Sequence, residues 1–196
     1  MGVQHTHEKD LFWNYYISLK NDLEIIEKYI EFDQPNYKTY STQLAKLLLE
    51  SASEVDVVMK QLCNLLDKGK SYDNIVAYRS TIKKHLGDSF LNERVCIPRH
   101  GIELDPWEAW REKGAKNPMW WKSYNNVKHR RDQHFNEANL QNVLNAQAAL
   151  FLTIIYYRGI SQAEGITMDE YHIRNAVMDT MRDLNPEDYF LRLKGF

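Results

Sequence analysis

Apolar residues recur at helical spacing along most of the chain. Between residues 7 and 32 they recur at near-helical spacing, with Lys and Glu between them, which predicts a first helix. The clearest pattern starts at Ser41 or Thr42, either of which can act as the N-cap, and continues to Leu66. A Lys-Gly-Lys run at residues 68–70 ends it, because cations suit the last turn of a helix and Gly readily leaves the helical conformation.

Further helices are predicted by the same periodicity and by the Pro, Gly and Asn residues at their ends. A third helix stops at Gly87, a short one opens after Pro106, and Asn136 is expected to cap a long helix, which Gly159 closes. The predicted segments are residues 73–86, 107–113, 118–131, 136–158 and 168–182. The chain is therefore expected to have an all-α fold, a compact bundle of five or six helices.

The stretch from residue 89 to residue 105 has a different pattern. Two short apolar segments, at residues 94–98 and 101–105, flank an Arg-His pair. They predict a small hairpin or two extended arms inserted into the bundle. Pro98 lacks the amide hydrogen that a central strand needs, so it is expected to confine the first arm to an edge.

Length and composition fit one domain with a packed core. The chain has 196 residues, of which 43% are hydrophobic and 12% aromatic, unlike a disordered chain. Residues 8–160 are expected to form the core of this single domain (1–196), with residues 161–196 as a C-terminal extension. The eight Gly and five Pro are few for this length, which favours long helices over the many turns of a β fold.

No pattern typical of a secreted or membrane protein is found. The N-terminus lacks the basic start and apolar run of a signal peptide, and the apolar stretch at residues 148–157 is too short to span a bilayer. Cys63 and Cys96 allow at most one disulfide, and Cys63 lies in an apolar helical stretch where a reduced thiol is expected. A cytoplasmic location without membrane contact is the prediction that follows.

A basic and aromatic segment lies between residues 107 and 134. The formal net charge of −2 excludes a globally basic nucleic-acid binder but leaves room for such a local patch. The segment contains Trp107, Trp110, Trp120 and Trp121, with the cations Arg111, Lys113, Lys116, Lys122, Lys128, Arg130 and Arg131. Cations that neutralise phosphates and rings that stack on bases are typical of single-stranded RNA binding. The alternative is that the Trp residues are core and the charges form a solvated face.

One face of the helix predicted at residues 118–131 combines groups that bind phosphate and move protons. Lys122, Asn125 or Asn126, and His129 are three or four residues apart and therefore share this face. The unperturbed pKa of His, about 6.5, suits acid or base work near neutral pH. Asn can hold an imidazole tautomer or donate a hydrogen bond to a phosphate oxygen. The spacing therefore predicts a candidate catalytic site.

The same segment resembles a known family. Residues 120–131 read Trp-Trp-Lys-Ser-Tyr-Asn-Asn-Val-Lys-His-Arg-Arg, and residues 135–140 read Phe-Asn-Glu-Ala-Asn-Leu. The first stretch resembles the Tyr-Asn-x-Val-Lys-His-x-Arg signature of HEPN-like proteins, and residues 47–56 resemble an early helix of that family. The likeness extends over residues 10–160 or so.

The resemblance implies a compact helical bundle, often dimeric, of the kind found in ribonucleases, toxins and defence or stress-response systems. Active members are endoribonucleases that use neither metal nor cofactor, and two copies of an Arg-x(4–6)-His motif usually face each other across the dimer. The chain is therefore expected to bind RNA as a homodimer through residues 122–131. An antitoxin or another protein is a further partner that the resemblance suggests.

Specific roles follow from the same match. The expected catalytic residues are His129, Asn125 and Lys122, the RNA-binding residues Lys128, Arg130, Arg131, Trp121 and Tyr124, and the supporting residues Glu54, Asn126 and His134. Glu54 would pair with the cations or orient His129 from the second helix. The sequence departs from the motif at Lys122, because active members have Arg, whose bidentate fork Lys lacks. Either Lys122 and His129 act with Asn125 as the catalytic pair, or the site binds without cleaving.

A non-catalytic helical module for protein association and dimerisation is the alternative function. In that case Tyr124, Asn125 and His129 are buried and hydrogen-bonded to one another or to Glu54, and Trp120 and Trp121 are core.

Other reactive groups have little support. Ser51 has no His nearby in sequence, and His5 and His7 lie at the N-terminus, where metal binding would be adventitious. Asp169 and His172 are expected to be part of a solvated helix start. No metal site is predicted.

Overall fold

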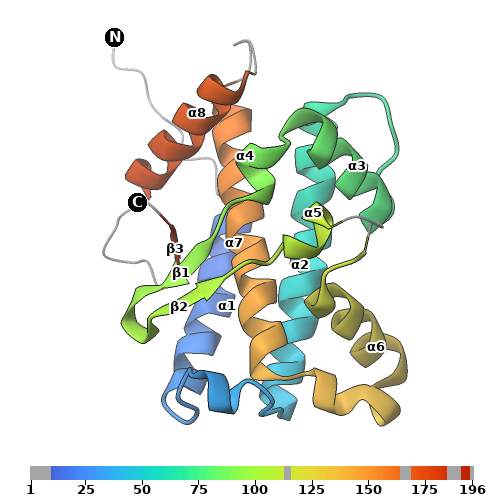
Figure 1. Ribbon diagram of the computed structural model, residues 1–196, viewed down its shortest axis with the longest axis vertical. Helices are drawn as coiled ribbons and strands as arrows, with labels where there is room; N and C mark the ends of the chain where they lie inside the picture. Colours follow the sequence, from blue (N-terminus) through green and yellow to red (C-terminus); the bar gives the residue numbers. More distant parts are fainter. Residues whose placement is uncertain (1–9, 113–115, 164–168, 185–190, 195–196) are drawn as a thin grey trace.

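The computed structural model describes residues 10–112, 116–163, 169–184 and 191–194. Over these residues the chain forms eight α-helices and a three-stranded sheet (Figure 1). The helices are α1 (Leu11–Glu27), α2 (Thr42–Leu66), α3 (Ile75–His85), α4 (Asp88–Leu91), α5 (Glu108–Arg111), α6 (Met119–His134), α7 (Leu140–Gln162) and α8 (Glu170–Asp183). The fold is mainly α, as predicted, but the sheet makes it not purely all-α.

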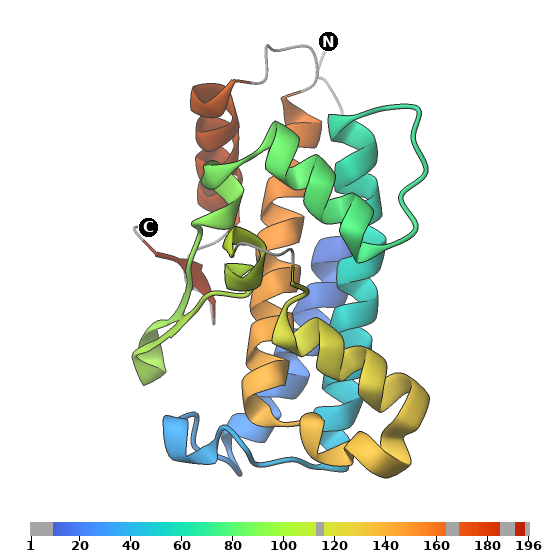
Figure 2. The same cartoon turned by 45° about the vertical axis from the view of Figure 1, so that its right-hand side comes forward.

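Helices α2 and α7 lie side by side at the centre of the bundle (Figures 1 and 2). Their N-terminal ends are joined by an isolated β-bridge between Tyr40 and Asn139. Helix α1 packs beside both, α8 packs on α7, and α6 covers the ends of α2 and α7 where they begin. The position of α6 therefore leaves its outer side facing solvent.

Both central helices begin at side-chain caps. Ser41 Oγ accepts a hydrogen bond from the Leu44 amide at 3.2 Å, which confirms Ser41 as the N-cap of α2. At the start of α7, Asn139 Oδ1 accepts from the Asn142 amide at 3.1 Å. The prediction that Asn136 caps this helix was wrong, because Asn136 lies in a 3₁₀ turn, Phe135–Glu137, that precedes it.

Helix α7 is buried on nearly all sides. Its length and composition would suffice to cross a membrane, the one such case among the described helices, but 83% of its apolar window is buried within the bundle. Each large apolar side chain buried this way stabilises the fold by about 1.5–3 kcal/mol. Gly159 does not close α7 as predicted but lies inside the helix. The absence of a side chain there lets α8 pack closely, since a Cβ would lie 3.0 Å from the backbone of Ala176 and Val177.

The predicted hairpin is present and gains a third strand. Strands β1 (Val95–Ile97) and β2 (Ile102–Leu104) pair antiparallel, and β3 (Arg192–Leu193) pairs with the other edge of β1. The first arm is thus the central strand, not an edge. Pro98 permits this because it follows the last paired residue and begins a 3₁₀ turn, Pro98–His100, so no ladder hydrogen bond is lost.

Candidate nucleic-acid interface

Helix α6 forms the candidate interface and ends in a sharp change of direction. It starts after Pro118, as predicted, and the backbone leaves the helical conformation at Arg130, where φ is −143° and ψ is 52°. A turn through His134 and the 3₁₀ turn Phe135–Glu137 then lead into α7. The chain therefore folds back, and residues after the break approach residues before it.

The inner face of α6 is part of the hydrophobic core. Its buried side chains are Trp120, Trp121, Ser123, Tyr124 and Val127. Trp120 Nε1 donates to the Pro106 carbonyl at 2.8 Å, and the Trp120 ring meets the Trp107 and Trp121 rings edge-on at 5.3 and 5.6 Å. The Trp cluster is thus core, in line with the alternative interpretation of the sequence.

Trp121 and Tyr124 need a correction as base-stacking residues. Trp121 is 8% exposed and Tyr124 is 6% exposed, and their rings pack against each other at 5.5 Å. Stacking on a base requires an exposed ring face. These two rings lie on the side of α6 that packs against α2 and α7, so their faces are covered. Contacts to RNA by these two rings are therefore not available in this arrangement.

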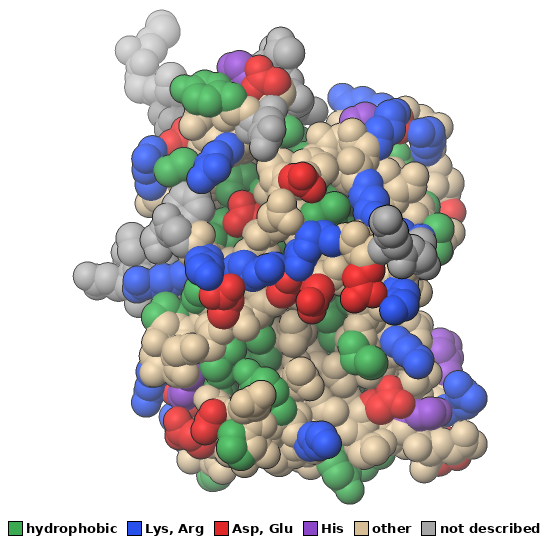
Figure 3. Space-filling view, in the orientation of Figure 1, with side chains coloured by type: hydrophobic (Ala, Val, Ile, Leu, Met, Phe, Trp, Pro, Cys, Tyr) green, Lys and Arg blue, Asp and Glu red, His purple; other side chains and the backbone are tan. Residues whose placement is uncertain are grey.

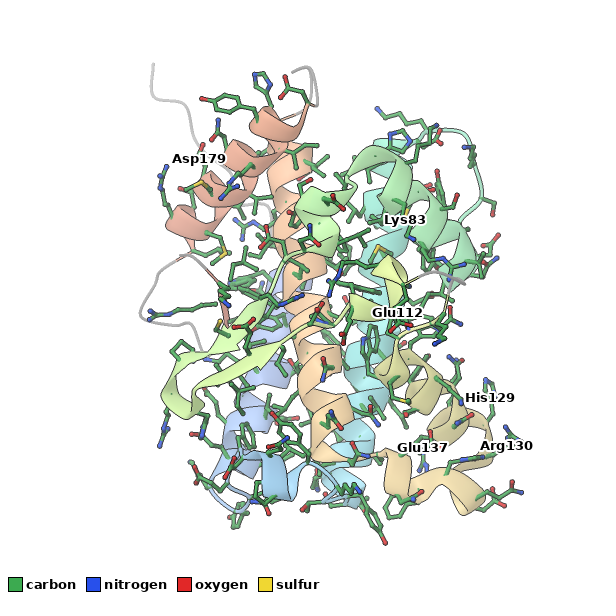
Figure 4. The ribbon with its side chains drawn as sticks, in the orientation of Figure 1. Lys83, Glu112, His129, Arg130, Glu137 and Asp179 are labelled. Atoms are coloured by element: carbon green, nitrogen blue, oxygen red, sulfur yellow. The ribbon has the colours of Figure 1, made fainter. Side chains whose placement is uncertain are left out.

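The outer face of α6 carries three exposed cations and one exposed His, which together we call the α6 basic end: Lys128, His129, Arg130 and Arg131. None of the four forms an ion pair with a carboxylate among the described residues. Lys128 Nζ instead donates to Tyr124 Oη at 3.2 Å and lies 5.3 Å from the centre of that ring. Figure 4 shows His129 and Arg130 at the outer end of α6, and Figure 3 shows cations and His gathered there at the right-hand edge.

Two upstream cations are already neutralised. Both oxygens of Asp105 accept from the Arg111 guanidinium, which also donates to the Leu91 carbonyl, and the hydrogen bond to Asp105 raises the pKa of Arg111. Lys116 pairs with Glu112 at 3.2 Å. Lys113 lies outside the described residues. The available positive charge is therefore concentrated at Lys122 and the α6 basic end.

A polar cluster stabilises the break in α6. Glu137 accepts from Asn126 Nδ2 at 3.1 and 2.9 Å, and its Oε1 lies 2.7 Å from His134 Nδ1. Burial by itself would raise the pKa of Glu137, but hydrogen bonds from Asn126, His134 and Ser123 outweigh it and the pKa is lowered. Asn126 and His134, predicted as supporting residues, are thus brought together by a carboxylate that sequence reasoning missed.

Lys122, Asn125 and His129 share the outer side of α6 without contacting one another. Lys122 and His129 are exposed, and Asn125 Nδ2 donates to the Trp121 carbonyl at 2.8 Å. A groove of about 730 Å³ runs beside the first half of the helix and is lined by Lys116, Trp121, Lys122, Asn125 and Asn126 together with Ala109, Glu112, Asn117 and Met119. His129 lies beyond the end of that groove. The predicted catalytic residues therefore share a face but not a closed pocket.

Glu54 does not reach α6. It lies near Tyr15 of α1. Burial is the main cause that raises the pKa of the Tyr15 hydroxyl, and the negative charges of Glu50 and Glu54 raise it further. Burial also raises the pKa of Glu54 itself. The prediction that Glu54 orients His129 is thus wrong, because the side of α2 that carries Glu54 faces α1.

The remaining reactive groups have structural roles or none. Ser51 is buried and accepts a hydrogen bond from Gln147 of α7, and the described residues contain no group of three metal-ligating side chains. Cys63 is buried and unpaired, and burial raises its pKa to about 12. Asp169 caps α8 by accepting from the His172 amide, as expected for a solvated helix start. His5 and His7 lie outside the described residues.

Comparison with protein-family models, with curated proteins and with solved structures finds no match for this chain. The site is therefore interpreted from its own geometry.

Proposed function

We propose that this chain is an HEPN-like RNA-binding protein whose α6 basic end contacts backbone phosphates. One observation supports this above the others: Lys128, Arg130 and Arg131 are exposed at neighbouring positions of the chain and form no ion pair among the described residues. Cations at neighbouring positions of the chain repel one another, and a bound polyanion relieves that repulsion. Glu137, which follows in the turn after α6, is already hydrogen-bonded to Asn126 and His134.

The break at Arg130 supports the proposal because it spreads the cations. On a continuous helix, neighbouring side chains point about 100° apart. The non-helical conformation of Arg130 turns the following residue out of that regular path. The cations of the α6 basic end therefore do not all lie along one straight side of a helix. Such an arrangement suits a flexible single strand, whose phosphates can adapt to it.

Metal-independent endoribonuclease activity is a second candidate, favoured by the two His residues beside these cations. His129 is exposed next to Lys128 and Arg130, and His134 is held by Glu137. Attack of a ribose 2′-hydroxyl on the adjacent phosphate needs a group that accepts a proton, and a neutral imidazole can do so. Lys122 can neutralise a phosphate as a point charge but not as a bidentate donor.

A non-catalytic protein-association module is the remaining candidate. Its support is the burial of Trp120, Trp121 and Tyr124, which that interpretation expects. The exposure of His129 is against it, because the same interpretation expects that ring to be buried.

The test of RNA binding is fluorescence anisotropy with a labelled single-stranded RNA of mixed sequence. The variant Lys128→Ala/Arg130→Ala/Arg131→Ala is compared with Lys28→Ala/Lys38→Ala/Lys83→Ala, which removes the same charge from exposed positions elsewhere. We expect the first variant to bind at least about tenfold more weakly and the second to bind nearly as wild type does. Equal losses in the two variants, or no loss in the first, would rule the proposal out.

The test of cleavage uses the same RNA in EDTA, with wild type, His129→Ala and His134→Ala, and analysis of the product ends. Cleavage by wild type that leaves 2′,3′-cyclic phosphates and is lost in one His variant identifies the group that transfers the proton. Binding without cleavage by any of the three assigns the site to binding alone.

A further inference from the structure

We propose that a second copy of this chain docks on the outer face of α1 and α2, with the two α1 helices antiparallel about a twofold axis. This inference is independent of RNA binding, because the surface includes no residue of α6. It therefore differs from the dimer that the family resemblance implies, in which the residues of the α6 motif face each other. In Figures 1 and 2, α1 lies behind α2 and α7, whereas α6 lies at the lower right.

An exposed apolar stripe runs along α1. Leu11, Tyr15, Ile25 and Tyr29 are 69%, 42%, 51% and 83% exposed. They are separated by helical steps of three or four residues once Ser18 and Asp22 are included, so all six lie on one side. Tyr29 stays in line because its amide donates to the Ile26 carbonyl at 2.9 Å in the turn that continues α1. This is a row of large apolar side chains without cover in the described part of the chain.

The order of the stripe suits pairing with its own copy. Apolar residues lie at both ends and the polar Ser18 and Asp22 lie in the middle. In an antiparallel pair centred between Ser18 and Asp22, Leu11 faces the second copy's Tyr29, and Tyr15 faces the second copy's Ile25. Every large apolar residue of the stripe thus meets an apolar partner. A twofold pair requires such self-complementarity, because one surface must serve both copies.

The charges beside the stripe show the same complementarity. Lys46 of α2 lies level with Asp22 of α1, since their side chains pair at 3.3 Å. Because α1 and α2 run antiparallel, Glu50, one turn further along α2, lies level with Ser18. The proximity of Glu50 to Tyr15 and to Lys46, whose pKa it raises, fits this position. The rotation that exchanges Ser18 with Asp22 therefore sets Glu50 of each copy opposite Lys46 of the other.

The size of the face is adequate for a specific dimer. Two adjacent helices, each about 10 Å in diameter, overlap here over the roughly 25 Å length of α1. A standard interface buries about 800 Å² of accessible surface on each partner, which a face of this extent with protruding side chains can supply. Val57 of α2, which is 40% exposed, adds an apolar side chain on the α2 side.

The experiment measures the mass of the full chain by light scattering over a concentration series. Wild type is expected to be a dimer, and Ile25→Glu to weaken association at least about tenfold by placing a charge among apolar side chains. Val76→Glu is the matched control, because Val76 is 54% exposed on α3, outside the proposed surface. A monomeric wild type, or an Ile25→Glu variant that dimerises as wild type does, overturns the proposal. Dimerisation that is broken by Arg130→Glu and not by Ile25→Glu also overturns it.

Charge exchange tests the orientation of the pair. Lys46→Glu and Glu50→Lys are each expected to be mainly monomeric, because each sets like charges opposite one another. Mixed together, they are expected to form a heterodimer in which opposite charges meet again. This rescue separates the interface from any folding defect within one copy, such as loss of the ion pair to Asp22, since mixing does not repair such a defect. Single variants that dimerise normally, or a mixture that stays monomeric, overturn the proposed orientation.

Discussion

Nδ1 of His134 lies 2.7 Å from Oε1 of Glu137, across the turn that follows the break in α6. The same carboxylate accepts two hydrogen bonds from Nδ2 of Asn126, which lies in α6 before the break. The pair therefore fixes the direction in which the chain leaves α6, and with it the position of the cations at Arg130 and Arg131.

Replacing Glu137 is expected to make stability less dependent on pH. The folded pKa of Glu137 is lowered by its hydrogen bonds, so its ionised form stabilises the fold above the unfolded pKa, near 4.5, and this contribution is lost as pH falls through the folded pKa. Glu137→Gln is therefore expected to lower the free energy of unfolding by about 1 kcal/mol at pH 7. Urea unfolding from pH 7 to pH 3 measures this. A difference that stays constant over that range, or grows as pH falls, would contradict the assignment.

Gly159→Ala is expected to destabilise the protein by about 1–3 kcal/mol, because its methyl group must push α7 and α8 apart. The added Cβ would lie 3.0 Å from the backbone of Ala176 and Val177, which cannot move independently of α8. Thermal unfolding monitored by circular dichroism gives the difference. Gln162→Ala, an exposed change near the end of the same helix, is the control and should alter stability little. Equal stability of the two variants would show that the close approach of α8 is absent.

Trp121→Phe is expected to reduce stability without reducing RNA affinity. The Trp121 ring is 8% exposed and packs between the Trp120 and Tyr124 rings. A smaller ring leaves unfilled space and is expected to cost about 1–3 kcal/mol. Chemical unfolding and RNA anisotropy on the same sample separate the two effects. A large loss of RNA affinity with unchanged stability would mean that Trp121 acts as a base platform after all.

Much of the fold could be predicted because the signals are local. The apolar periodicity of residues 41–66 and the Ser41 cap depend on neighbours in sequence, and α2 appears as Thr42–Leu66. The third strand could not be predicted, because β3 has two residues and pairs with β1 across about half the length of the chain. The cap predicted at Asn136 was wrong because that residue lies in the 3₁₀ turn after α6, and Asn139 caps α7 instead.

The candidate site could be predicted in part for the same reason. That Lys122, Asn125 and His129 share a side follows from helical spacing, and they do share it. Which side of α6 is buried depends on packing against α2 and α7, so the burial of Trp121 and Tyr124 required the structure. The helix end predicted at residue 131 lies next to the break at Arg130, but the role of Glu137 depends on the path of the turn that follows, which helical spacing does not predict.

The dependence of RNA affinity on salt tests the central claim most directly. Each phosphate contact to a single strand contributes about 0.7 to the slope of log affinity against log salt. The variant Lys128→Ala/Arg130→Ala/Arg131→Ala is therefore expected to show a slope smaller than that of wild type by about 2. Removal of Lys28, Lys38 and Lys83 is expected to leave the slope unchanged. If the two variants have equal slopes, or if wild type shows no dependence on salt, the α6 basic end does not bind RNA phosphates.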